Sequence, residues 1–261
     1  MGFVGSFLAR AYLNTKKWPQ NDGSAPRAYQ EQSKLEVLFG PGVWEEFRGR
    51  TVLDFGCGDG REVVEIASRG AARAVGIDIR EDLLAAAAAR ASDASLSAVC
   101  EFASSASGKF DVVLSVDSME HFPEPAQVLE IMADLLNPGG CVLMSFGPPW
   151  LHPLGHHFPL FPWAHLVFTE RAMMEWRSRF KNDGAKKFTE CLGGLNQMTL
   201  SRFERLVNQS PLEVVSSEYV PIRKLRILHN RLTREFMTAV VRCKLRRRAG
   251  DGPVVLAGDR R

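Results

Sequence analysis

Residues 51–145 alternate between short apolar runs and segments that favour helices. The segments between the runs have amphipathic spacing or a high content of alanine and leucine, which both indicate helix. The apolar runs have the length of buried strands and read TVLDFG, AVGIDI, SAVCEF, FDVVLSVD and CVLMSFG in chain order. Because strands that alternate with helices at this spacing form right-handed crossovers, we expect a parallel sheet with helices on both faces.

The first strand continues into a turn that has glycine at every second position, VLDFGCGDG. A dinucleotide-binding turn requires the pattern G-x-G-x-x-G, but Arg61 stands where the third glycine should be. Asp54 and Asp59 would also repel a pyrophosphate at the N-terminus of the following helix. The turn therefore favours a ligand that carries a positive charge.

The second strand ends at Asp78, a position from which a carboxylate can bind both hydroxyls of a ribose. Its structural alternative is the N-cap of the helix that follows. Together with the acidic turn, a ribose contact at Asp78 predicts a nucleoside that is joined to a cation rather than to phosphates. S-adenosylmethionine has this chemistry, because its adenosine is linked through a sulfonium to an amino acid.

Four segments in order, VLDFGCGDG, GIDI, FDVVLSVDSMEHF and LLNPGG, resemble the motifs of class I S-adenosylmethionine-dependent methyltransferases. They are most similar to the branch that acts on small molecules and quinone precursors. The resemblance implies an α/β, Rossmann-like, doubly wound, seven-stranded sheet that is mostly parallel, with an antiparallel last strand and with helical or loop insertions as a cap. LEVVSSEYV (212–220) and PVVLAG (253–258) would be the closing strands.

The resemblance also implies which residues bind S-adenosylmethionine. Family members often have a polar residue near the adenine amine, where this chain offers only an alanine and hydroxyls in FASSAS. Cys57 is interpreted as a small turn residue and not as a nucleophile. The implied donor contacts are Asp54, Gly56, Cys57 and Gly58 on the methionine side, Asp78 at the ribose, Ile79 and then Ala103 and Ser104 at the adenine, and Val116 near the methyl group.

The segment after the fourth strand, DSMEHF, contains the candidate catalytic residues His121 and Asp117. It follows the carboxyl end of a strand, which is where α/β proteins bind ligands. Methyl transfer to a hydroxyl requires alignment of the nucleophile and removal of its proton, and an imidazole is suited to the second task. The alternative is that His121 bonds to the backbone and shapes the loop.

Residues 146–168, FGPPWLHPLGHHFPLFPWAHLVF, have neither a strand nor a helix period and hold four of the six histidines. One interpretation is a lid over an aromatic or lipid-like acceptor, and the other is packing within the protein. No metal is expected, because no acid lies among these histidines. The candidate acceptor contacts are Trp150, His152, His156 and His157.

Residues 223–248 contain ten lysines or arginines and one acid, Glu235. Apolar residues within them fall at helical spacing, so we expect a long basic amphipathic helix. Its charged face is either solvated or attached to an anionic surface such as lipid headgroups. The apolar residues at that spacing are Leu225, Leu228, Leu232, Phe236 and Val240.

Composition narrows the function classes further. The formal net charge of +3 is too small to favour nucleic acid as a partner. Five scattered cysteines without metal-ligand spacing favour free thiols, and hence a cytoplasmic location. No apolar run reaches the length of a transmembrane helix.

These observations predict four segments: an N-terminal helical cap (1–50), a donor-binding core (51–145), a lid on the substrate side (146–208), and closing strands with an inserted basic helix (209–261). The predicted activity is transfer of a methyl group from S-adenosylmethionine to a small or lipid-like acceptor, at oxygen. The alternatives are an RNA or protein methyltransferase and a donor-binding module without catalysis.

Overall fold

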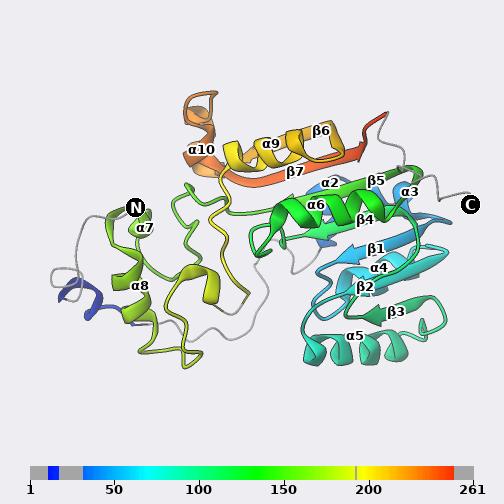
Figure 1. Cartoon of the computed structure of the whole chain (residues 1–261), viewed down its shortest axis with the longest axis horizontal. Coiled ribbons are helices and arrows are strands. Elements are labelled where there is room, and N and C mark those ends of the chain that lie inside the picture. Colours follow the sequence, from blue (N-terminus) through cyan, green and yellow to red (C-terminus); the bar gives the residue numbers. More distant parts are fainter. Residues whose placement is uncertain (1–10, 18–31, 192, 250–261) are drawn as a thin grey trace, which may run out of the picture.

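The computed structural model describes residues 11–17, 32–191 and 193–249, which form a seven-stranded sheet with helices on both faces and a smaller group of helices and loops beside one end of the strands (Figure 1). The strand order is β3-β2-β1-β4-β5-β7-β6. The first five strands are parallel, and β7 is antiparallel to both β5 and β6. The strands are β1 (Thr51–Phe55), β2 (Arg73–Ile77), β3 (Cys100–Ala103), β4 (Phe110–Val116), β5 (Leu136–Phe146), β6 (Leu212–Pro221) and β7 (Thr238–Arg247). The predicted fold class is confirmed.

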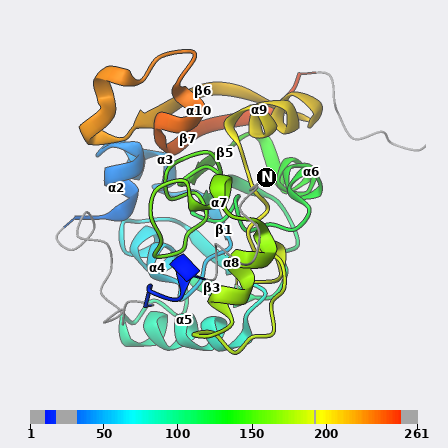
Figure 2. The same cartoon turned by 90° about the vertical axis from the view of Figure 1, so that its left-hand side faces the viewer.

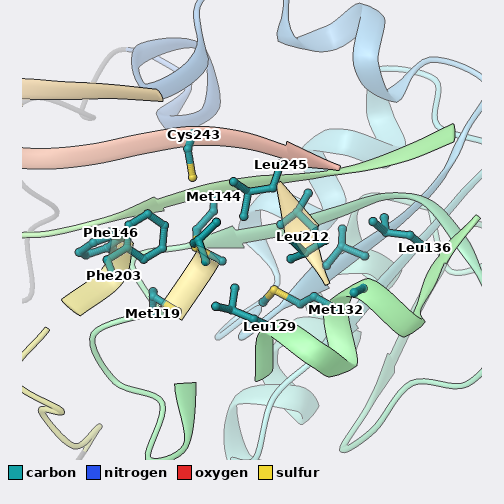
Figure 3. Packing of buried hydrophobic residues seen from close by; sticks show 14 of the residues in the cluster. Met119, Leu129, Met132, Leu136, Met144, Phe146, Phe203, Leu212, Cys243 and Leu245 are labelled. Atoms are coloured by element: carbon teal, nitrogen blue, oxygen red, sulfur yellow. The ribbon is translucent and has the colours of Figure 1, made fainter. Parts of the chain in front are cut away.

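Alternate residues of the central strands face opposite sides of the sheet, as their period of two requires. Leu53 and Val113 join a cluster with α6 (Pro125–Asp134) and α9 (Leu200–Gln209) on one face. Figure 3 shows this cluster, where Leu129 and Met132 of α6 lie among side chains of β5, β6 and β7. Residues of the other face join a second cluster with α2 (Lys34–Phe39), α3 (Val43–Phe47), α4 (Arg61–Ser68) and α5 (Glu81–Asp93). Both faces of the sheet are therefore covered.

The segment between the end of β5 and the start of α9 lies outside the sheet, and we call it the lid. It contains α7 (Ala164–Val167), α8 (Glu170–Arg177) and the short 3₁₀ helix η2 (Phe188–Glu190), and it has a hydrophobic cluster of its own. Residues 11–17 pack against it, with the Tyr12 ring 5.5 Å from that of Phe161. Because β4 and β5 are parallel, the lid lies beside the carboxyl ends of the strands (Figures 1 and 2).

The prediction of a long basic helix over residues 223–248 is wrong. The chain instead forms the 3₁₀ helix η3 (Arg223–Leu228), the single turn α10 (Arg234–Met237) and then strand β7. Val241, Cys243 and Leu245 alternate with basic residues, and only these three enter the buried cluster. This period of two indicates a strand, and it outweighs the helical spacing that the apolar residues further upstream suggest.

The basic residues of β7 point to the opposite face of the sheet, where carboxylates lie within ion-pair distance. Arg242 contacts Glu218 at 2.7 Å. Lys244 contacts Glu46 of α3 at 2.5 Å. Much of the positive charge that appeared to form one face of a helix is therefore paired across the sheet.

LEVVSSEYV forms most of β6, as predicted, but the strand that pairs with it is β7. PVVLAG, expected as the last strand, lies outside the described residues. Among the helices of the described residues, none has both the length and the apolar character needed to cross a bilayer.

Candidate active site at the carboxyl edge of the sheet

The turn between β1 and α4 is built on glycines in the left-handed region of backbone conformation. Gly60 has φ 73°, and a Cβ there would lie 2.6 Å from the Cβ of Ala87, so only glycine allows α5 to approach this closely. Gly58 has φ 52°, but a Cβ there would meet no atom within 4 Å. Gly58 therefore faces open space in which a ligand can lie against the backbone.

The carboxylate of Asp78 is held in a fixed orientation beside this turn. One of its oxygens accepts a hydrogen bond from the backbone N–H of Gly58 at 2.9 Å, and the other accepts from that of Arg80 at 3.0 Å. The N-cap position of α5 belongs to Arg80, not to Asp78. The arrangement leaves lone pairs on a pre-oriented carboxylate, which suits a pair of vicinal hydroxyls.

The residues expected around the adenine lie next to Asp78. The side chain of Ile79 is 91% exposed, which leaves an aliphatic surface free to pack against a planar ring. The backbone N–H of Asp78 donates to the carbonyl of Ala103 at 3.3 Å, so the end of β3 lies alongside. Ala103 and Ser104 are both exposed there. The fold therefore brings these predicted residues together on one wall.

Asp54 lies in β1 beneath the turn and is 3% exposed. Burial, followed by the neighbouring Glu62 carboxylate, raises the pKa of Asp54 well above its usual value. Cys57 is buried beside it, and burial together with the charges of Asp54 and Asp78 also raises the pKa of its thiol, which agrees with a packing role. Gly56, the remaining residue of the predicted set, donates its N–H to the carbonyl of Ile77 at 2.8 Å.

Lys34 of α2 enters the same region, although the sequence analysis did not identify it. Its Nζ lies 2.9 Å from a carboxylate oxygen of Asp117 and 3.6 Å from one of Glu62. Asp117 has φ 51° and directly follows Val116, which is buried. The predicted residues Val116 and Asp117 thus lie at the carboxyl edge, between the glycine turn and the lid.

His121 is held by the lid. Its Nδ1 lies 2.6 Å from the carbonyl oxygen of Gly194. Because a carbonyl can only accept, Nδ1 carries the proton, and in the neutral ring Nε2 keeps its lone pair. The His157 ring lies 5.6 Å from that of His121, and burial followed by the charge of His121 lowers the pKa of His157. Of the four predicted acceptor contacts, His157 is therefore the one placed beside the candidate base.

Glu120 is a second residue that the sequence analysis missed. Its side chain is 3% exposed, and one carboxyl oxygen accepts from the backbone N–H of Gly147 at 3.0 Å. The other oxygen has no hydrogen-bond partner among the described residues. Burial is the main cause that raises the pKa of Glu120 to about 8. The sequence signal that could have identified Glu120 is its position directly before His121 in DSMEHF.

Asn196 joins the lid to the loop that carries these residues. Its side-chain amide donates to the carbonyls of Met119 and Phe122 at 2.8 and 2.9 Å. Its backbone N–H donates to the carbonyl of Glu120 at 2.9 Å. Three hydrogen bonds from one buried residue therefore fix the loop on both sides of His121, and no sequence motif pointed to them.

Comparison with known proteins agrees with this geometry. Residues 52–140 match the family model described as a methyltransferase domain. The match runs from β1 to the first residues of β5, so this part of the chain is similar to methyltransferase domains. The structure also resembles an S-adenosylmethionine-dependent methyltransferase from Mesorhizobium loti, with a TM-score of 0.52 and 17% identity over 77% of this chain and 93% of that chain, which supports the same fold.

Two curated relatives align with part of this chain. The ubiquinone biosynthesis O-methyltransferase of Methylococcus capsulatus is 37% identical over 103 residues, which cover 37% of this chain and 43% of the relative. The protein of the same name from Neisseria meningitidis serogroup C is 38% identical over 107 residues, which cover 38% and 45%. The alignments thus span less than half of the length of either relative.

Three of the predicted acceptor contacts lie inside the lid and not against the methyltransferase domain. Trp150 is 5% exposed and packs with Phe188, at a ring distance of 5.0 Å. His152 and His156 are buried, and burial lowers the pKa of each to about 4. Their rigid, aromatic surroundings form the core of the lid, so the packing interpretation describes these three residues.

Proposed function

We propose that this chain transfers the methyl group of S-adenosylmethionine to a hydroxyl oxygen of a small or lipid-like acceptor in the cytoplasm. The observation that carries the proposal is the Asp78 carboxylate, fixed by the backbone N–H of Gly58 beside open space. Five free, buried thiols among the described residues are compatible with a reducing compartment.

The residues present fit the donor. Asp78 would bind the ribose hydroxyls, and the exposed Ile79 would cover the adenine. Asp54 and Asp117 would lie near the positive charges of the sulfonium and the amino group, which would stabilise the ionised carboxylates in return. Bound in this way, S-adenosylmethionine supplies a methyl group that is already activated by the sulfonium charge.

His121 would act on the acceptor. Its Nε2 would take the proton of the acceptor hydroxyl while the oxygen forms its bond to the methyl carbon and the carbon–sulfur bond breaks. The proton ends on the imidazole, and the electron pair of the broken bond ends on sulfur. The carbonyl of Gly194 would keep the ring in place, and His157 is the lid residue best placed to contact the acceptor.

The acceptor class is supported by the names of the two relatives, which are O-methyltransferases of ubiquinone biosynthesis. We infer an aromatic hydroxyl, with or without a lipid tail. The four-segment division belongs to this proposal: a cap at 1–50, the donor core at 51–145, the lid at 146–208, and the closing strands at 209–261 without the long helix. Contact with an anionic surface would be made by the connection between β6 and β7.

Calorimetry with the product S-adenosylhomocysteine tests the donor site. We expect binding by the wild type and at least about tenfold weaker binding by Asp78→Ala, because the ribose loses its charged acceptor. Glu101→Ala, a change of the same kind on β3, should bind as the wild type does. Equal binding by Asp78→Ala would contradict the proposal.

A screen with labelled donor then tests the reaction on phenols, catechols and polyprenylated phenols. His121→Gln should lose about a hundredfold or more of turnover while it keeps its affinity for S-adenosylhomocysteine. Transfer to RNA or to protein but to no small molecule would favour that alternative. Donor binding without turnover on any acceptor would identify a silent binding module.

A further inference from the structure

The connection between β6 and β7 emerges at the same edge of the sheet as the candidate active site. Since β7 is antiparallel to both neighbours, β6 runs parallel to β5, and its carboxyl end lies at the carboxyl edge of the parallel strands. Residues 222–237, which we call the β6–β7 tip, follow directly. Figures 1 and 2 show the tip projecting from the sheet on the side of the lid.

The tip exposes large apolar side chains. Ile227 and Leu232 are 94% and 90% exposed, and Leu228 and Phe236 are also exposed. Isolated apolar residues on a surface are common, but four exposed ones within one short projection are a concentration typical of a binding surface. None of the four belongs to a buried cluster of the described residues.

The backbone of the tip is nevertheless well bonded. The N–H of Ile222 donates to the carbonyl of Met237 at 2.8 Å and closes its base. The side chain of Asn230 accepts from the N–H of Leu232 at 2.9 Å, which forms a tight turn at its end. The apolar side chains are therefore presented outward by a defined turn and not by an open loop.

The tip also contains four exposed cations: Arg223, Lys224, Arg226 and Arg231. Across the described part of the chain, no carboxylate lies within ion-pair distance of any of them. The acid of the tip, Glu235, is turned away, because it accepts from the backbone N–H of Leu200 at the start of α9. The outer surface of the tip thus combines apolar and positive groups without a balancing negative charge.

We propose that the β6–β7 tip docks the chain on an anionic lipid surface. The aliphatic side chains would enter the boundary of the acyl chains, and the cations would bind the headgroup phosphates. This inference rests on the proposed function in one respect: docking would turn the lid and the carboxyl edge toward the membrane, where a lipid-like acceptor resides. The two most exposed apolar side chains of the tip, Ile227 and Leu232, are aliphatic and offer no face on which a base can stack, which distinguishes this surface from one for RNA.

Sedimentation with phospholipid vesicles tests the docking directly. The wild type should bind vesicles of phosphatidylcholine that contain about a third phosphatidylglycerol, and bind neutral phosphatidylcholine vesicles much less. Ile227→Ser/Leu232→Ser and Arg226→Glu/Arg231→Glu should each lower the partition coefficient about tenfold or more. The matched control is Arg48→Glu/Lys109→Glu, which changes the net charge by the same amount. These residues precede β1 and β4, at the edge of the sheet opposite the tip, so this variant should bind the vesicles within about twofold of the wild type.

Two results would overturn the inference. One is a wild type that does not bind anionic vesicles, or tip variants that bind them as the wild type does. The other is displacement of the wild type from the vesicles by single-stranded RNA, together with RNA binding that the charge variant loses and the serine variant keeps. This result would assign the tip to nucleic acid. Binding of S-adenosylhomocysteine by the same variants separates the two proposals, since docking can fail while the donor site stays intact.

Discussion

The Nδ1 of His121 lies 2.6 Å from the carbonyl oxygen of Gly194, so a side chain in the loop after β4 is oriented by a residue 73 positions further along the chain. Asn196, two residues after Gly194, binds the loop on both sides of His121. The lid therefore sets the tautomer of the ring as well as the position of the loop that carries it. This contact makes the state of the lid and the proposed base interdependent.

Asn196→Ala should impair turnover more than donor binding. The variant loses two hydrogen bonds to buried carbonyls, which should lower the free energy of unfolding by about 1–3 kcal/mol. We expect kcat to fall about tenfold or more through misplacement of His121, with little change in affinity for S-adenosylhomocysteine.

Asn137→Ala is the matched control, because its side chain donates to Asp111 beside the amino ends of the strands. It should lose a similar amount of stability but keep kcat. If the two variants retain equal kcat, Asn196 has a structural role alone. Urea unfolding and single-turnover rates on both proteins decide the question.

Substitution by alanine should affect stability and donor binding differently at Gly58 and at Gly60. Gly60→Ala combines a left-handed backbone with a contact of 2.6 Å to Ala87, so we expect a loss of about 2–4 kcal/mol in the free energy of unfolding. Gly58→Ala should lose only about 1 kcal/mol, because its methyl group enters open space. That methyl group would occupy the proposed donor site, so binding of S-adenosylhomocysteine should weaken at least about tenfold. Thermal unfolding with and without ligand measures both effects.

Glu120 should make the unliganded protein less stable as the pH rises. Its pKa is raised to about 8 from an ordinary value of 4.5, so its contribution is fully present below about pH 4.5 and is lost as the pH rises through about 8. Glu120→Gln keeps an oxygen that can accept from Gly147 but does not titrate. Between pH 6.5 and 8, the wild type should lose up to about 1.4 kcal/mol per pH unit relative to this variant. Parallel slopes of stability against pH in urea unfolding would show that Glu120 does not ionise in this range.

The lid should loosen in mild acid. Burial lowers the pKa of His152, His156 and His165 to about 4, so each contributes stability that is fully present above about pH 6.5 and is lost as the pH falls toward 4. Hydrogen exchange of the α8 amides should accelerate between pH 6.5 and 5 beyond the intrinsic change, because α8 packs in the cluster of Trp150 and Phe158, whose rings contact His165 and His156. Helix α4 packs in a different hydrophobic cluster and serves as the internal control. Equal behaviour of the two helices would rule out the buried histidines as the cause.

The donor-binding core could be predicted from the sequence because each of its elements carries its own signal. The apolar runs identify β1, β4 and β5, and the glycines and Asp78 mark the turn and the second strand end. These signals extend over fewer than about ten residues, and burial of the strands on both faces is enough to produce them. The position of Asp78 beside Gly58 follows once the two strands are parallel neighbours.

Other features depended on contacts between distant segments. β7 was mistaken for a helix because apolar residues from η3 onward satisfied a helical spacing, while its partners β5 and β6 determined the actual conformation. The lid histidines were assigned to the acceptor because a chain of aromatic residues looks the same whether it lines a site or fills a core. Only their burial distinguishes the two.

The sequence by itself determined the parallel strands, the glycine turn and the carboxylates beside it, because local patterns of apolar residues and residue chemistry encode them. The tertiary structure decided which of the histidines stands at the site, how Gly194 and Asn196 hold it, and where Glu120 and Lys34 enter. These features arise from packing between segments far apart in the chain, and no short stretch of sequence contains the partner that determines them.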